Sequence, residues 1–249
     1  MKIRYILSSV ALASLSLTSC SDLDTAPEGN IITSDKKGEI LEEMPERGLA
    51  GVRAIFQGLS AYEPNYEAFG KIERHNDIGY PSVLMFTDAN TEDVVSDPNG
   101  YNWNENSLDY SDRTYTSYES QMVWNDHYNA IYVANTVIKG YNTGEDPTNE
   151  EARFFYAQGL AARAYFYFNL AQLYQFTYKD NETKPCIPVV TDENTAKSQV
   201  EGTPCSTVEE TYTQIKSDID HAITLLEGTS YEREDKRYIS LAVAYGIRA

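Results

Sequence analysis

The residue with the clearest chemistry in this chain is Cys20. It ends the run Leu17-Thr18-Ser19-Cys20, which follows the basic residues Lys2 and Arg4 and an apolar stretch that begins at Ile6. This layout is typical of a secretory signal. The cysteine resembles that of a lipobox, where a signal peptidase cuts before the residue, its thiol is acylated, and the acyl chains anchor the protein in a membrane. We expect a lipoprotein signal peptide at 1–19 and a lipidated tether at 20–34; the alternative is an ordinary signal peptide with an incidental cysteine.

Residues 97–120 combine flat aromatic side chains with amides and carboxylates. Trp103 lies next to Tyr101, Asn102 and Asn104 in the sequence, and three more tyrosines follow: Tyr110, Tyr115 and Tyr118. Sugar rings stack their apolar C–H faces on aromatic rings while amides and carboxylates bind the hydroxyls, and small-ligand sites need this mixture. We predict that Trp103, Tyr101, Asn102 and Asn104 contact a ligand. The alternative for Trp103 is a loop residue that covers the helical body.

Arg74 is the remaining candidate ligand contact. It begins the polar cluster Arg74-His75-Asn76-Asp77. This cluster could reach a ligand, or it could be an ordinary solvated loop.

The histidines and acidic residues show no pattern for metal binding or catalysis. His127 and His221 lie in predicted helices far apart in the sequence, which is not a metal-ligand spacing. The run from Asp88 to Asn99 begins like a calcium loop, but its sixth residue is Asp and its twelfth is Asn, where such loops need Gly and Glu. Nucleophile-elbow, P-loop and dinucleotide motifs are missing, and no glycosidase dyad stands out among the many acidic pairs. We expect no metal, no cofactor and no enzymatic activity.

Cys186 and Cys205 are the cysteines that remain after Cys20. In an oxidising compartment they could form a disulfide, stabilising the fold by roughly 3 kcal/mol through loop-closure entropy. They could equally be two unpaired thiols at the ends of an extended crossover, because the sequence does not give the distance between them.

The charge of the chain argues against a nucleic-acid partner. The formal net charge is −18, and phosphate groups would be repelled. Tyrosine is unusually frequent, with 20 residues against 8 phenylalanines. Because its ring is apolar and its tip forms hydrogen bonds, tyrosine suits both recognition surfaces and the interior of a helical array.

Hydrophobic periodicity predicts an all-α protein organised around one central helix. Residues 148–176 are apolar nearly all round, as in an interior helix, yet Arg163 and Asn169 interrupt the run, which argues against a membrane span. Small residues at helical spacing allow partner helices to approach closely. Thr148 and Glu151 have the spacing of a capping box.

Further helices are predicted on both sides of the central one, at about 45–59, 124–140, 206–226 and from 236 onward. Ser206 and Glu209 repeat the capping-box spacing. The short loop before the central helix predicts antiparallel packing with the helix that precedes it. Between 60 and 117, turn motifs such as Gly79-Tyr80-Pro81 break the pattern. So long an irregular segment is usually functional.

An ordered succession of motifs resembles the SusD/RagB family of outer-membrane nutrient-binding lipoproteins. The motifs are Trp124, Tyr128, Ile131, Ala134-Asn135 and Ile138; Glu151-Ala152-Arg153-Phe154 with Arg163-Ala164 and Leu170; Ile187–Thr191; Thr207-Val208, Glu210, Tyr212, Ile215 and Asp218-Ile219; and Arg237–Ser240. The lipobox fits as well. The resemblance covers residues 20–249 and departs from the family pattern at Cys186 and Cys205.

The resemblance implies tetratricopeptide-like helical hairpins with a long irregular ligand-binding segment. It also implies a surface-exposed outer-membrane lipoprotein that binds glycans and delivers them to a SusC-like TonB-dependent transporter. Since family members are about twice as long, we expect 35–249 to be a helical domain that is incomplete at its C-terminus. The alternatives are a helical scaffold that binds only the transporter, a member that binds peptides, and an exported glycosidase.

Overall fold

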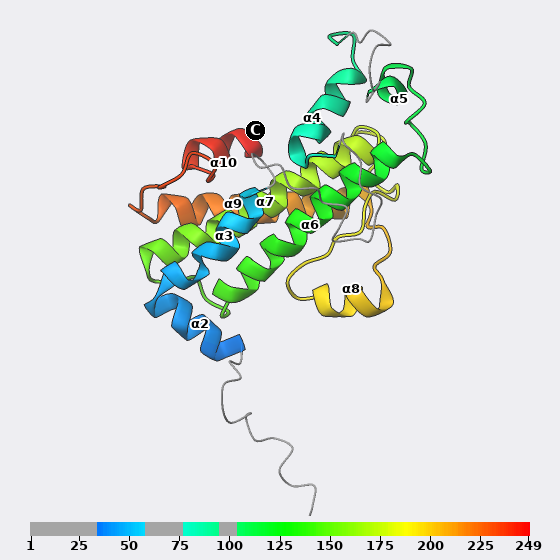
Figure 1. Ribbon diagram of the computed structural model, residues 1–249. Helices are drawn as coiled ribbons and strands as arrows, with labels where there is room; N and C mark the ends of the chain where they lie inside the picture. Colours follow the sequence, from blue (N-terminus) through cyan, green and yellow to red (C-terminus); the bar gives the residue numbers. More distant parts are fainter. Residues whose placement is uncertain (1–33, 58–76, 95–103) are drawn as a thin grey trace, which may run out of the picture. The chain divides into compact units, whose positions relative to one another are not determined.

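A computed structural model describes residues 34–57, 77–94 and 104–249 (Figure 1). The predicted signal peptide, most of the predicted tether and Cys20 lie outside these residues. The elements are α2 (Ser34–Glu43), the 3-10 helix η1 (Pro45–Gly48), α3 (Leu49–Gln57), α4 (Tyr80–Ala89), α5 (Glu105–Leu108), α6 (Tyr118–Tyr141), α7 (Glu150–Tyr174), α8 (Thr195–Glu201), α9 (Val208–Glu227) and α10 (Leu241–Arg248). Within the described residues the only β pairing is an isolated antiparallel bridge between Pro185 and Thr207. The prediction of an all-α protein is confirmed.

The central helix of the sequence is α7, and it is an interior helix. It packs along α6 on one side and α9 on another, and it also contacts α3 and α10. Phe155, Tyr167 and Leu170 are fully buried. Helix α6 comes very close at Gly159, where an added Cβ would meet the Ile138 side chain at 2.9 Å. The close packing predicted for the small residues of this helix therefore occurs where α6 and α7 cross.

Both predicted N-caps are displaced by one residue, and at α7 the capping box is wrong, because Ala152 stands where the acidic partner of Asn149 would be needed. Asn149, not Thr148, caps α7: its side-chain oxygen accepts from the backbone N–H of Glu151 at 2.9 Å. Thr148 is engaged elsewhere, because its N–H and hydroxyl both donate to the carboxylate of Glu42 on α2.

The second capping box consists of Thr207 and Glu210 at the start of α9, rather than Ser206 and Glu209. Ser206 is in extended backbone here. Its N–H donates to the carbonyl of Ile187 at 2.9 Å, and its carbonyl accepts from the N–H of Cys186 at 2.7 Å. Because Ser206 pairs with Cys186 and Ile187, α9 begins one residue later than predicted.

The prediction of an irregular segment between 60 and 117 is wrong in part, because this segment contains α4 and α5. The sequence Gly79-Tyr80-Pro81 begins α4 and is not a separate turn. Gly79 takes a positive φ of 81° before the first turn, and Pro81 lies within that turn, where its missing N–H costs no helical hydrogen bond.

Other predicted boundaries also move. The helix predicted at 45–59 is divided into η1 and α3, and the last helix begins at Leu241 instead of near residue 236. The residues before it are held by the buried amide of Gln158. This amide donates to the carbonyl of Ile239 at 2.9 Å and accepts from its N–H at 2.7 Å. Helices α2 and α8 were not predicted.

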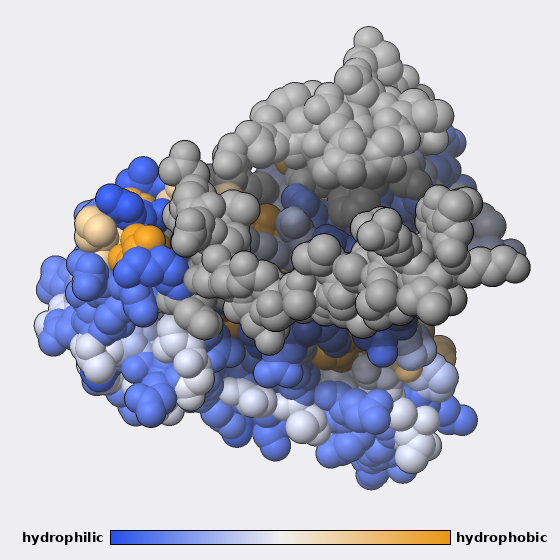
Figure 2. Space-filling model, turned by 90° about the horizontal axis from the view of Figure 1, so that it is seen from below, coloured by the Kyte–Doolittle hydropathy of each residue, from blue (hydrophilic) through white to orange (hydrophobic). Residues whose placement is uncertain are grey.

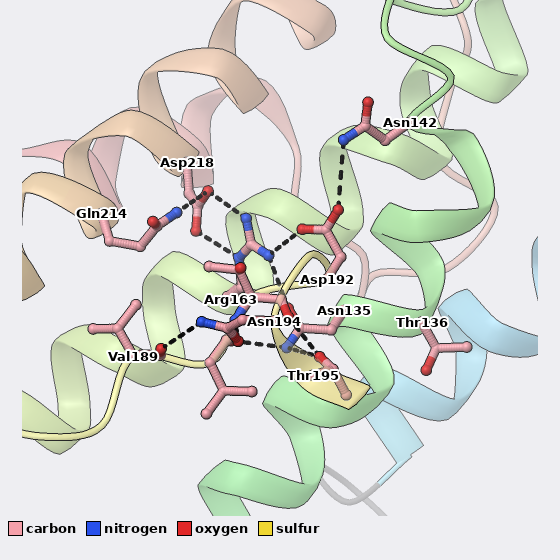
Figure 3. Close-up of polar contacts among 12 residues, drawn as sticks. Asn135, Thr136, Asn142, Arg163, Val189, Asp192, Asn194, Thr195, Gln214 and Asp218 are labelled. Carbon is pink, nitrogen blue, oxygen red and sulfur yellow. Dashed lines mark hydrogen bonds and ion pairs between the residues drawn. The ribbon is translucent and has the colours of Figure 1, made fainter. Parts of the chain in front are cut away.

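A buried ion-pair network around Arg163 joins α6, α7 and α9 to the crossover between α7 and α9 (Figure 3). The guanidinium of Arg163 donates to both carboxylate oxygens of Asp218 on α9, at 2.7 and 2.8 Å. It also donates to Asn135 on α6 at 2.8 Å and to Asp192 in the crossover at 2.9 Å. Burial alone would lower the pKa of Arg163, but the hydrogen bonds and charges of Asp218 and Asp192 raise it above its usual value. Arg163 thus stays charged inside the protein.

The crossover is held on the helices by three further side chains. The hydroxyl of Tyr128 donates to the carbonyl of Pro188 at 2.7 Å, and the Asn135 amide donates to the carbonyl of Val190 at 2.8 Å. The hydroxyl of Tyr167 donates to that carbonyl and accepts from the N–H of Val190. Asn135 thus uses its side chain to hold a backbone group of the crossover.

Among the described residues, no helix combines the length and the apolar character that crossing a membrane requires. On the face drawn in Figure 2 the described side chains are mostly hydrophilic, with small separate hydrophobic areas.

We predict that Arg163→Met lowers the free energy of unfolding by about 3–5 kcal/mol, because the buried carboxylate of Asp218 loses its counter-ion. Urea unfolding followed by circular dichroism measures this change. Arg237→Gln is the control. It breaks an ion pair with Asp235 whose side chains are 42% and 33% exposed, so the change should be much smaller than for Arg163→Met, because solvent screens exposed pairs. Equal effects of the two substitutions would show that the network does not stabilise the fold.

Candidate functional site

A pocket of about 1100 Å³ lies at one end of the α6–α7 hairpin. It is bounded by the end of α4, the loop between α5 and α6, the first turns of α6 and the last turn of α7. Its lining residues are Phe86, Thr87, Asn90, Asp112, Arg113, Thr114, Tyr115, Thr116, Ser117, Glu119, Ser120, Gln121, Val123, Trp124, Gln172, Leu173 and Tyr174. The volume is large enough for a small ligand of several rings.

Asp112 organises the loop that forms one wall of the pocket. Its carboxylate accepts from the hydroxyl of Ser107 at 2.6 Å and from the side-chain amide of Asn90 at 3.2 Å. Its backbone carbonyl accepts from the Ser120 hydroxyl at 3.2 Å. These bonds connect α5, the end of α4 and the start of α6. The buried side chain of Asp112 thereby fixes the position of the loop between α5 and α6.

Aromatic side chains form a second wall. Trp124 is half-buried, with its ring 4.7 Å from that of Tyr128 and 5.1 Å from that of Tyr174. The hydroxyl of Tyr174 donates to the carbonyl of Ser120, and burial raises the pKa of this tyrosine. Tyr115, at the rim, is 98% exposed. The pocket therefore presents both a fixed aromatic surface and a freely accessible aromatic ring.

The polar groups of the pocket are held in place by neighbouring side chains. Glu119 is buried and accepts from the side-chain amide of Asn106 at 3.1 Å. Arg113 lies over the ring of Tyr110, with 4.1 Å from its guanidinium carbon to the ring centroid. Its Nε donates to the side-chain oxygen of Asn90 at 3.0 Å. Aromatic faces beside a few fixed polar groups are the usual composition of a small-ligand site.

Most of the ligand contacts predicted from the sequence lie outside the described residues: Trp103, Tyr101, Asn102 and Arg74. Asn104 is described. It lies immediately before α5, where its carbonyl accepts from the N–H groups of Ser107 and Leu108, and it does not line the pocket. Tyr115 belongs to the predicted segment 97–120 and does line it.

The sequence interpretation missed Trp124, Tyr174, Asp112 and Glu119 as site residues. Trp124 begins the helix predicted at 124–140, and it packs against the main core. The other side of the Trp124 ring lines the pocket, because the first turns of α6 extend past the part of α7 that other elements cover most fully. A helical stripe in the sequence does not show which end of the stripe remains uncovered.

A buried polar cluster lies between α4, α6 and α7, outside the pocket lining. His127 is fully buried, 3.2 Å from the carboxylate of Asp126, and its ring packs against Phe166 at 5.3 Å. Asp77 accepts from the hydroxyl of Tyr118 at 3.1 Å, and burial raises the pKa of this acid. In the part of the chain that the structure describes, no three His, Cys, Asp or Glu side chains group closely enough to hold a metal ion.

Both remaining cysteines are free thiols in the structure. Cys186 is buried and Cys205 is exposed. The two lie on neighbouring extended segments, since the N–H of Cys186 donates to the carbonyl of Ser206. Burial raises the pKa of the Cys186 thiol. Of the two alternatives left open by the sequence, the structure has the unpaired thiols.

Comparison with known proteins links the chain to one family. Residues 78–248 match the profile of a SusD-like family described as "starch-binding associating with outer membrane". No curated protein matches the sequence.

Several solved structures are similar. A SusD-like carbohydrate-binding protein from Bacteroides vulgatus is 23% identical with a TM-score of 0.66, over 82% of this chain and 40% of that one. A laminarin-binding SusD-like protein is 20% identical with a TM-score of 0.56, over 80% and 38%. A SusD-like carbohydrate-binding protein from Bacteroides fragilis is 12% identical with a TM-score of 0.56, over 84% and 37%. The chain therefore spans about 40% of the length of these proteins or less, and the likeness confirms the predicted tetratricopeptide-like helical fold.

We predict that Cys205 reacts readily with a maleimide in the folded protein, whereas Cys186 reacts only after unfolding, because its thiolate form is disfavoured by burial. Mass spectrometry of peptides after alkylation, with and without denaturant, measures both rates. If neither thiol reacts in denaturant until a reductant is added, the two residues form a disulfide and the unpaired state is wrong.

Proposed function

The chain belongs to the SusD-like family, and from this premise we propose that it binds glycans at the outer membrane and passes them to a transporter. The observation that carries the proposal is the pocket at the end of the α6–α7 hairpin, where Trp124, Tyr174 and Tyr115 lie beside buried carboxylates. Sugar rings offer apolar faces to aromatic rings and hydroxyls to acceptors, so this lining matches a glycan. The protein is a binding component and not a hydrolase.

The aromatic groups of the pocket have different roles in this proposal. The ring of Trp124 is held from two sides by Tyr128 and Tyr174, so it offers a preorganised stacking surface that loses little entropy on binding. Tyr115 has almost no contact with the protein and closes on a ligand from the rim. Trp103, Tyr101, Asn102 and Arg74 are proposed to contact the ligand as well, as predicted from the sequence.

The cellular setting is part of the same proposal. Acylation of Cys20 anchors the protein at the outer membrane, exposed on the cell surface, and a SusC-like TonB-dependent barrel receives the glycan. The alternatives are a peptide ligand and a scaffold that binds only the transporter.

We expect Tyr115→Ala to weaken glycan binding about fivefold to tenfold, which is the loss of one aromatic contact. The full-length protein is titrated by calorimetry and affinity electrophoresis against a panel that includes starch, laminarin and peptides. Folding should be unchanged, because the side chain of Tyr115 is 98% exposed. Trp103→Ala is measured beside it and should also weaken binding.

Tyr132→Ala is the matched control for this experiment. Tyr132 is 49% exposed on α6 but does not line the pocket, so its removal should leave the dissociation constant unchanged. If no glycan or peptide binds while the protein still co-purifies with the transporter, the scaffold alternative is correct. If binding persists in Tyr115→Ala at full strength, the ligand site lies elsewhere.

The anchor has its own test. Cells grown with an alkyne-labelled fatty acid should label the natural protein, and Cys20→Ala should abolish the label and release the protein from the membrane fraction, because stable residence requires the acyl chains. Cys205→Ala controls for the loss of a thiol and should keep the label. Labelling of Cys20→Ala would place the acylation on another residue.

A further inference from the structure

Among the residues that the structure describes, the charged groups lining the pocket are two carboxylates and one guanidinium, those of Asp112, Glu119 and Arg113. Asp112 and Glu119 are only 6% and 5% exposed. They lie in a chain whose formal net charge is −18. Charges in a partly enclosed site act more strongly than in bulk water because the local dielectric is lower. An anionic ligand in this pocket is therefore repelled by the wall that carries these two carboxylates.

Asp112 has an unused acceptor. One carboxylate oxygen accepts from Ser107 and Asn90. The other oxygen is buried and has no hydrogen-bond partner among the described residues. An unsatisfied buried acceptor costs free energy, which a donor brought by a ligand can recover. Carboxylates accept but do not donate, so Asp112 and Glu119 favour ligand groups with O–H or N–H donors.

Arg113 does not offset these acids in the manner of an anion site. Its Nε and Nη2 atoms both donate to Asn90, at 3.0 Å to the side-chain oxygen and 3.3 Å to the carbonyl. These two atoms form the edge of the guanidinium that commonly binds carboxylates in a bidentate manner. The face of the guanidinium is occupied by Tyr110. The cation is thus committed to holding the loop against the end of α4.

We propose that this pocket selects uncharged, hydroxyl-rich glycans and rejects glycans that carry carboxylate or sulfate groups, with Asp112 and Glu119 as the specificity-determining residues. The inference rests on the proposed glycan-binding function and names the chemical class of its ligand. Aromatic stacking supplies contact with any sugar ring, and the two acids decide which ring substituents are accepted. Like-charge exclusion of this kind is a common source of specificity.

The test compares two forms of one polymer. The neutral polysaccharide that binds the full-length protein most tightly in the panel is compared with the same polysaccharide after oxidation of its primary hydroxyls to carboxylates. By calorimetry at low salt, the oxidised form should bind at least about tenfold more weakly. The difference should shrink at about 0.5 M salt, because the Debye length then falls to a few ångströms.

Substitutions assign this preference to residues. Glu119→Gln and Asp112→Asn should each reduce the ratio of the two dissociation constants at least about threefold, since each removes one negative charge from the wall. Glu145→Gln removes the same charge from an exposed residue in the loop between α6 and α7, at the opposite end of the hairpin, and should leave the ratio unchanged.

Each outcome decides a different point. Equal affinity for the neutral and oxidised forms overturns the inference and leaves the glycan-binding function intact. The inference is also overturned if only anionic glycans bind, or if the oxidised form binds more tightly and loses that gain in Arg113→Gln. If no glycan of either kind binds, the proposed function itself fails.

Discussion

Arg163 imposes the constraint on which the arrangement of the helices depends. A guanidinium in the middle of an interior helix must be compensated on all sides, because a buried charge without partners is very costly. The compensating groups come from other elements: Asp218 from α9, Asn135 from α6 and Asp192 from the crossover (Figure 3). One side chain therefore determines how neighbouring helices and a long connection meet. Apolar packing alone would leave more freedom, since small residues tolerate sliding between helices.

The pocket is a consequence of this frame. The crossover is fixed near the middle of α7 through Val190, and α9 covers one flank of α7. A smaller separate cluster joins Val83 and Phe86 of α4 to Met122 and Val123 in the first turns of α6, and Tyr174 in the last turn of α7 packs against it. Between α4 and the hairpin end, the loop organised by Asp112 leaves a space that the core does not fill. A rigid hairpin thus presents Trp124 and Tyr174 from regular helices, which hold side chains more accurately than loops do.

The sequence predicts the helical body well for a clear physical reason. The long periodic stretches of α6, α7 and α9 depend on burial of apolar faces, and such periodicity is local information. Cap positions are less predictable because they depend on distant partners. Thr148 has the chemistry of an N-cap, but its backbone N–H donates to the carboxylate of Glu42 on α2 instead. Ser206 likewise forms backbone hydrogen bonds with Cys186 and Ile187 in the crossover, so α9 begins after it.

The candidate site could be predicted only in part. Tyr115 lies in a segment whose composition indicates recognition, and the structure places it on the rim of the pocket. Trp124 and Tyr174 carry the signature of core residues, because a half-buried aromatic at the end of a stripe has the same spacing as a fully buried one. Asp112 is one of many acids in the chain, and its role follows from a bond to Asn90 across 22 residues. No local pattern encodes that pairing.

The composition of the pocket also bears on how a capture protein should bind. The aromatic groups are Phe86, Tyr115, Trp124 and Tyr174, and each aromatic contact is worth only about 0.5–1.5 kcal/mol beyond its area. Part of this gain is offset by the ordering of Tyr115, which is free before binding. Under the proposed function, such a lining gives a modest affinity and a correspondingly high dissociation rate. The proposed transfer of the ligand to a transporter needs rapid release more than tight binding. Under the same proposals, the fixed rings, the exposed ring of Tyr115 at the rim and the acids that exclude anionic sugars give selectivity without slow release.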